Sequence, residues 1–202
     1  MNWIIRMRGL GAFALMVVAC FGNESIASGP LKLADDGWHT WRTAAAEQSA
    51  ELCCFSWTGS GARRRTCDLD RSSGNYGAVE GYSNYSGEVQ VYALMRSGKP
   101  EKITVLSPQC RVSTDTEIRD HGLQDQDVSV NWLRKHIGSR TRLSSDALAA
   151  ISVHGGDYSL EVLVAVVESN NDDDLREEAI FWLVTSGSDA AFEYIDNLLT
   201  GT

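Results

Sequence analysis

The sequence predicts an α+β protein in which a small, disulfide-stabilised, β-containing N-terminal unit precedes an array of paired α-helices. Two patterns predict this order. Four cysteines and several strand-like runs lie between residues 28 and 111, whereas a helix–turn–helix pattern recurs at a spacing of 32 residues beyond residue 126. The chain of 202 residues is 43% hydrophobic and 22% charged, which is the composition of a globular protein.

Residues 1–27 have the composition of a secretory signal peptide. Arg6 and Arg8 precede the apolar run "GLGAFALMVVACFG", and the polar, small-residue stretch "NESIASG" follows it. This order is that of an export signal, and Ser25 and Ala27 fit the small-residue rule for cleavage after Ala27. The apolar run is shorter than the roughly 20 residues that span a bilayer. We therefore expect a periplasmic or secreted protein.

A second interpretation of the same region concerns Cys20. The stretch "VVAC", which ends at Cys20, resembles the bacterial lipoprotein box, in which the cysteine becomes the lipidated first residue. The resemblance implies a lipoprotein anchored at Cys20, and membrane association is expected only under this alternative.

The remaining cysteines are Cys53, Cys54, Cys67 and Cys110. An even number in an exported chain predicts disulfides. Because a ring closed between adjacent residues is strained, Cys53 and Cys54 should have different partners. Two connectivities stay open: 53–67 with 54–110, or 53–110 with 54–67. A four-thiolate zinc site is the rival, but structural zinc sites usually present ligand pairs two to four residues apart, and this spacing does not.

The predicted N-terminal unit, residues 28–111, contains one clear hairpin. Val89 and Val91 alternate with polar neighbours, as do Ile103 and Val105, and the turn residues of "RSGKPEK" lie between the two runs. The aromatic residues Trp38 and Trp41, and the tyrosines Tyr76, Tyr82 and Tyr85, are expected to fill its thin core, with a binding surface as the alternative. Residues 112–126 are expected to be a linker.

Residues 127–202 are expected to be helical, with two repeats at 144–169 and 172–200. When the chain is shifted by 32 residues, apolar positions of one helix pair fall on those of the next: Ala147 on Ala179, Ile151 on Leu183, Leu160 on Phe192 and Leu163 on Ile195. Such self-similarity predicts an α-solenoid. The acidic run at residues 172–174 is expected to begin a helix rather than to bind calcium.

The stretch "DDDLREEAIFWL" resembles the first helix of a HEAT repeat at Leu175, Arg176, Ala179 and Leu183. Phe192 and Ile195 occupy stacking positions on the second helix. The resemblance implies a HEAT-like array, and an ion pair of Arg176 with Asp172 or Asp174 between repeats. The first copy has no matching arginine. The layout as a whole resembles exported bacterial proteins that contain HEAT repeats.

Charge and motifs exclude several functions. The net charge of −9 argues against nucleic-acid binding, which needs a basic surface. The histidines His39, His121, His136 and His154 include no pair at the spacing of a helical metal site, and neither a nucleophile elbow nor a phosphate-binding loop occurs. We expect no catalytic residues, no metal ligands and no cofactor.

The predicted function is that of a non-catalytic, exported interaction or scaffold module that binds a protein partner through its helical array. The acidic charge favours a basic or neutral partner. The apolar end of the last helix, at Leu198 and Leu199, suggests a homodimer through the C-terminal helices. The alternative is an accessory or inhibitor protein whose disulfide-bridged unit is the ligand-binding part. An uncharacterised enzyme is the third hypothesis.

Overall fold

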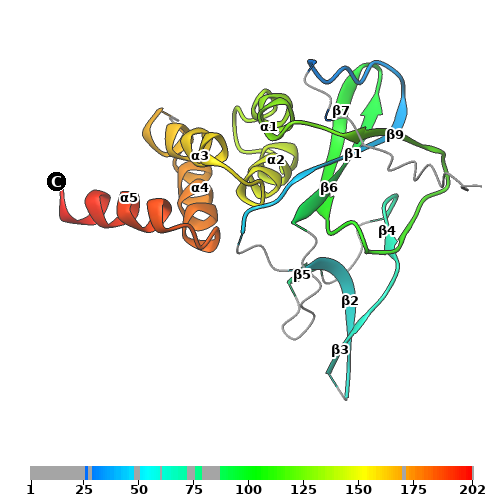
Figure 1. The fold of residues 1–202 in the computed structure, drawn as a ribbon, viewed down its shortest axis with the longest axis horizontal. Helices are drawn as coiled ribbons and strands as arrows, with labels where there is room; N and C mark the ends of the chain where they lie inside the picture. Colours follow the sequence, from blue (N-terminus) through cyan, green and yellow to red (C-terminus); the bar gives the residue numbers. More distant parts are fainter. Residues whose placement is uncertain are drawn as a thin grey trace, which may run out of the picture.

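A four-stranded sheet forms the centre of the described chain, with helices on one face and small disulfide-linked strands on the other (Figure 1). The computed structural model describes residues 26, 29–47, 51–59, 61–71, 76–78, 87–169 and 172–201. The expected signal peptide, its cleavage site at Ala27 and the lipidation candidate Cys20 lie outside these residues.

The order of the strands in the main sheet is β7-β6-β1-β9. These strands are β1 (Gly37–Ala44), β6 (Glu88–Arg96), β7 (Lys99–Leu106) and β9 (Ile118–Leu123). The expected β6–β7 hairpin is confirmed, and its turn residues Ser97 and Gly98 both have positive φ, as a two-residue hairpin turn of type I′ requires. The fourth strand, β9, pairs in parallel with β1.

The alternation of side chains along the strands creates two cores. Trp41, Val91 and Val105 point to one face, where they join the helical residues in one hydrophobic cluster. Trp38 and Tyr92 point to the opposite face and pack with Cys54 and Cys67. Trp38 and Trp41 are both fully buried, so these two rings fill the core, as expected.

The smaller strands form the lobe that covers this second face. They are β2 (Leu52–Thr58), β3 (Gly61–Arg64), β4 (Cys67–Asp68), β5 (Tyr76–Ala78) and β8 (Val112–Ser113). Strand β2 pairs with β3 and β5, and β4 pairs in parallel with β8. Residues 112–126, which were expected to be a linker, thus contain β8 and the sheet strand β9. This edge strand has the polar sequence "IRDHGL", which lacks the alternation of apolar and polar residues that predicts a strand.

Five helices follow the sheet in the described part of the chain. They are α1 (Gln126–Arg134), α2 (Arg142–Ser152), α3 (Asp157–Ser169), α4 (Asp173–Thr185) and α5 (Asp189–Thr200). Thr141 caps the start of α2, and Asp172 caps α4 by accepting a hydrogen bond from the Leu175 backbone N–H. The acidic run therefore begins a helix, as expected. Within the described residues, no helix is long and apolar enough to cross a membrane.

The expected α-solenoid is wrong, because the helix pairs do not stack as repeats. In a solenoid each repeat packs on its neighbour in the same way. Here α1 and α2 pack on the sheet, α3 lies against α4, and α5 packs mainly on α4 at the far end of the molecule (Figure 1). The sheet presents an apolar face that α1 and α2 cover, so sheet and helices share one core instead of forming two separate units.

The positions that resemble a HEAT repeat have mixed environments. Leu175, Ala179 and Leu183 are fully buried, whereas Phe192 is 49% exposed and Ile195 is half-buried. Arg176 is exposed, and its guanidinium donates to Asp173 in the first turn of the same helix, at 2.9 Å. Asp174 instead pairs with Arg140. The inter-repeat ion pair that the resemblance implies is thus replaced by contacts within and before α4.

The turn between α2 and α3 docks on the end of β1 through Gly155. The Gly155 N–H donates to the Ala44 carbonyl at 3.1 Å, and a Cβ at Gly155 would lie 2.8 Å from the backbone oxygen of Ala45. Backbone atoms cannot yield as a flexible side chain can. We expect Gly155→Ala to lower the free energy of unfolding by about 1–3 kcal/mol in urea titrations. Gly138→Ala, whose Cβ would meet no atom within 4 Å, is the control. Equal effects would contradict the close approach.

Candidate functional site

A cavity of about 510 Å³ lies where the end of β1 meets the starts of α3 and α5. Strand end, turn and helix starts all contribute to its wall, which includes Ala46, Glu47, Gln126, His154, Gly156, Asp157, Ser159, Leu163, Ser188 and Asp189. Its volume is within the range of small-ligand and side-chain pockets, about 300–1,000 Å³. Sequence analysis did not single out this place, because its residues come from four separate segments.

The cavity has an acidic mouth. Glu47, Asp157 and Asp189 line it and are exposed, and the described lining residues include no lysine or arginine. Asp157 and Asp189 are the first residues of α3 and α5, where a carboxylate interacts favourably with the helix dipole. Each helix start carries about half a positive charge. Two such starts offset only about one of the three negative charges, so the mouth stays negative.

Under the cavity lies a buried chain of hydrogen bonds that joins sheet and helices. Trp41 Nε1 donates to Ser129 Oγ at 2.7 Å, and Ser129 Oγ lies 2.7 Å from His154 Nε2. His154 Nδ1 lies 2.7 Å from the Ala150 carbonyl, which can only accept. His154 Nδ1 therefore carries the proton, and Nε2 accepts from the serine hydroxyl. Burial lowers the pKa of His154 to about 4, so the ring is neutral at neutral pH.

Ser129 and His154 are as close as a nucleophile and its general base, but a substrate cannot reach the serine hydroxyl. Ser129 is fully buried, and its oxygen already accepts the indole N–H of Trp41. A substrate carbonyl must come within about 3 Å of a nucleophilic oxygen. In this arrangement the pair stabilises the contact of α1 and α2 with the sheet. The sequence did not predict this chain of hydrogen bonds, because Trp41, Ser129 and His154 are each separated by 25 or more positions.

The four remaining cysteines form two disulfides, Cys53–Cys110 and Cys54–Cys67. The structure thus selects one of the two connectivities that the sequence left open. Neighbouring residues of β2 point to opposite sides of the strand, so Cys54 enters the core beside Trp38 while Cys53 faces Cys110. This geometry explains why adjacent cysteines have separate partners.

A buried carboxylate accompanies the first disulfide. Glu51 is 6% exposed, pairs with Arg64, and lies 3.3 Å from Cys53 Sγ. Glu51, Cys53 and Cys110 are the one group of three or more candidate metal ligands that the described residues bring together. Because both sulfurs are bonded to each other, they are not thiolate ligands in this state.

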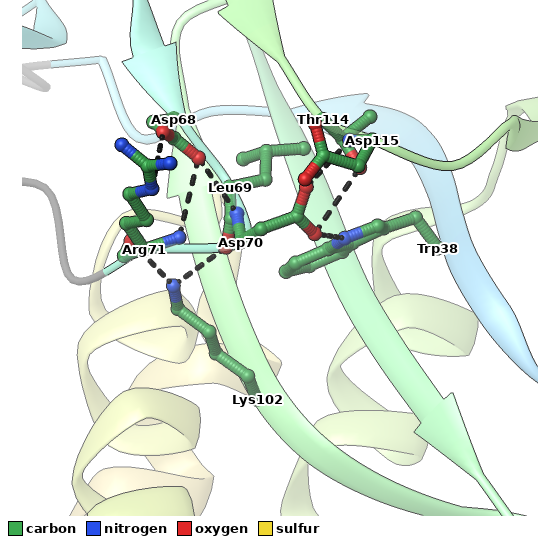
Figure 2. A network of polar contacts seen from close by, with 8 residues as sticks. All are labelled: Trp38, Asp68, Leu69, Asp70, Arg71, Lys102, Thr114 and Asp115. Atoms are coloured by element: carbon green, nitrogen blue, oxygen red, sulfur yellow. Dashed lines mark hydrogen bonds and ion pairs between the residues drawn. The ribbon is translucent and has the colours of Figure 1, made fainter.

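A second polar network fastens the loop at residues 68–71 to the sheet (Figure 2). Asp70 accepts from Trp38 Nε1 at 2.8 Å and from the Asp115 backbone N–H at 2.6 Å, and the hydrogen bond from Trp38 is the main cause that lowers its pKa. Lys102 Nζ donates to the carbonyls of Leu69 and Arg71 at 2.7 and 3.1 Å. Burial lowers the pKa of Lys102. Because the Asp70 carboxylate and the Lys102 ammonium both form these hydrogen bonds, they hold the loop in position on the sheet.

Large apolar side chains are exposed on the last two helices and on the β2–β3 hairpin. On α4 and α5 the exposed large side chains are Phe181, Val184, Phe192, Leu198 and Leu199. On the β2–β3 hairpin Trp57 is 68% exposed and packs edge-on against Phe55, with ring centroids 5.7 Å apart. The side chains of Tyr76, Tyr82 and Tyr85 lie outside the described part of the chain.

Of the four scattered histidines, two come together. His39 Nδ1 and His121 Nε2 are 2.8 Å apart across β1 and β9, whereas His136 and His154 follow the ends of α1 and α2. Burial lowers the pKa of His136 as well, which argues for a neutral ring rather than a cation on the helix dipole. Comparison of the chain with family models, with curated proteins and with solved structures finds no match.

Proposed function

We propose that this chain is a non-catalytic, exported interaction protein that binds a basic segment of a protein partner in the acidic cavity. The observation that carries the proposal is the cavity itself. It has room for a long side chain and its neighbours, and its mouth bears Glu47, Asp157 and Asp189 without a lysine or arginine among the described lining residues. The chain as a whole has a net charge of −9, which steers a basic partner toward it.

A lysine or arginine side chain suits this cavity better than a neutral one. Its aliphatic stem can cover Leu160 and Leu163 on the wall, while its charged end stays near the carboxylates at the mouth. A partner segment that carries such a residue in an extended stretch would combine both contacts.

Two observations support the proposal that the protein is exported. The composition of residues 1–27 is that of a signal peptide. The two disulfides suit an oxidising compartment such as the periplasm or the extracellular space. Anchoring through a lipid on Cys20 is the alternative route to the same compartment, and it would hold the cavity near a membrane surface.

A second candidate function places the binding surface on the disulfide-bridged lobe. The exposed Trp57 on the β2–β3 hairpin favours it, because exposed indoles are common anchors of protein interfaces. In that case the helices would support the lobe, and changes at the cavity would leave partner binding unaltered. Self-association through the exposed apolar side chains of α4 and α5 stays a prediction beside both candidates.

The test compares two triple variants of the mature chain that remove the same charge. One variant is Glu47→Gln with Asp157→Asn and Asp189→Asn, at the cavity. The control is Glu117→Gln with Glu161→Gln and Glu193→Gln, which are exposed elsewhere. The probe is a fluorescent peptide of alternating lysine and glycine, and its binding is followed by anisotropy at physiological salt.

We expect the cavity variant to bind the peptide about tenfold more weakly than the wild type, since each exposed ion pair contributes about 0.2–1 kcal/mol. The control should keep most of the affinity. Equal losses in both variants would show that the peptide responds to net charge alone, and the cavity proposal would then be wrong. Peptide binding lost on Trp57→Ala but kept in the cavity variant would favour the second candidate.

A further inference from the structure

Helix α5 presents an apolar face that the described part of the chain leaves exposed. Ala191 is the one buried residue of this helix, which packs mainly on α4 and extends from the body at the end far from the sheet (Figure 1). Phe192 is 49% exposed and Leu199 is 80% exposed. These two side chains lie two helical turns apart, with Ile195 between them in the same row. Leu198, beside the row, is 51% exposed.

This exposed row is more than the scattered apolar residues of an ordinary surface. Single exposed apolar side chains are common and need no explanation. Here large apolar side chains gather on one side of one helix within two turns, and exposed polar residues surround them. Contiguous apolar surface with a polar rim commonly marks a site of interaction. We call the surface formed by Phe192, Ile195, Leu198 and Leu199 the α5 face.

The charge around the α5 face is negative and concentrated. Residues 172–200 contain eight aspartates and glutamates and one arginine, a net charge of −7 out of −9 for the whole chain. Asp189 and Asp196 are both exposed. Asp196 lies four residues after Phe192 and three before Leu199, so it belongs to the same row, because positions three and four apart share one face of a helix. A cation on a docked segment would therefore meet a carboxylate beside the apolar row.

These charges decide between two occupants of the face. A second copy of this chain, as in the self-association expected from the sequence, would bring the acidic segment against its own counterpart. Charges within about 8 Å act on each other at physiological salt, and like charges across an interface disfavour binding. A segment that is apolar on one side and basic on the other suits both the row and its rim. An amphipathic α-helix has this division of faces, and it matches anchors spaced i, i+3 and i+7.

We propose that the α5 face binds an amphipathic, basic α-helix of a protein partner. The apolar side chains of that helix pack on Phe192, Ile195 and Leu199, and its lysines or arginines lie near Asp189 and Asp196. Helix α5 has 12 residues and is about 18 Å long, so a partner helix of three to four turns covers it. The α5 face does not depend on the acidic cavity, with which the proposed contacts share Asp189 alone.

The probe is a fluorescent peptide of leucine and lysine, about 14 residues long, whose leucines repeat at helical spacing. Its binding is followed by anisotropy at physiological salt. We expect the double variant Phe192→Ser/Leu199→Ser to bind it about tenfold more weakly, since the central apolar anchors of an interface commonly contribute this much. Trp57→Ser is the control, because Trp57 is 68% exposed on the β2–β3 hairpin, and its affinity should equal that of the wild type. Wild-type affinity in the double variant would overturn the proposal.

Two further peptides test the helix and its charge on the wild-type chain. A scrambled peptide of the same composition cannot form an amphipathic face, and a peptide with glutamate in place of lysine has the wrong charge. Each should bind about tenfold more weakly or worse, and equal binding of either would overturn the proposal.

Light scattering tests the other occupant. A wild-type dimer that dissociates in the double variant would overturn the proposal, because the face would then bind a second copy. The peptide of alternating lysine and glycine, which probes the cavity, should bind the double variant as it binds the wild type. Failure at the α5 face can thus be told apart from failure at the cavity.

Discussion

Replacement of Cys53 and Cys110 together by alanine is expected to lower the free energy of unfolding by about 4 kcal/mol. This disulfide joins residues 57 positions apart, whereas Cys54–Cys67 spans 13 positions. A cross-link stabilises mainly by restricting the unfolded chain, and the restriction grows with the logarithm of the loop. For Cys54–Cys67 the same relation gives about 3 kcal/mol. Urea titration of the oxidised variants measures both values.

Reduction of the wild-type chain removes both cross-links and should cost about 7 kcal/mol. The stability of a domain is commonly about 5–15 kcal/mol, so the reduced chain should be close to unfolding at 37 °C. The matched control is the Cys53→Ala/Cys110→Ala variant with reductant, which should lose only the smaller contribution. If the long-loop variant loses less than about 1 kcal/mol, the lobe is held by its packing on Trp38 and Leu106 instead.

Acidification from pH 6.5 to pH 4 is expected to lower the free energy of unfolding by about 3 kcal/mol through His154. Burial lowers the pKa of the folded histidine from 6.5 to about 4. Between these values the unfolded chain binds a proton that the folded chain does not bind. The contribution is therefore fully present above pH 6.5 and is lost as the pH falls toward 4. Protonation would also break the hydrogen bond that Nε2 accepts from Ser129.

The measurement is the pH dependence of urea unfolding in the wild type and in His154→Gln, whose difference isolates this residue. The other titrating groups are common to both proteins, including Asp146, whose pKa burial raises and whose effect has the opposite sign. Nuclear magnetic resonance should show the His154 ring largely unprotonated down to about pH 5, since its pKa is about 4. A titration of this ring near pH 6.5 would mean that the Trp41–Ser129–His154 chain is open to water.

Local patterns identified many elements of this protein. The alternation at residues 89–105 and its turn residues predicted the β6–β7 hairpin, because a two-residue turn with positive φ is encoded in the turn itself. The spacing of Leu175, Ala179 and Leu183 identified the buried stripe of α4, and the acidic run before it identified the helix start. An even number of cysteines predicted disulfides. The hairpin and helix signals each lie within a few residues of the structure that they specify.

Non-local contacts explain what the sequence did not predict. The solenoid expectation failed because periodicity reports which face of a helix is apolar, not whether a helix or a sheet covers it. Strand β9 is polar and becomes a strand only beside β1. The cavity likewise draws its acidic residues from distant segments.

The sequence by itself therefore determined the local elements: the hairpin, the helices and the capacity for two disulfides. Only the tertiary structure decided the pairing Cys53–Cys110, the contact of Ser129 with His154, and the meeting of His39 with His121. The physical reason is one of range. Backbone preferences and periodicity act over one turn or one strand, whereas these contacts depend on which buried faces meet, and that is set by the packing of the whole chain.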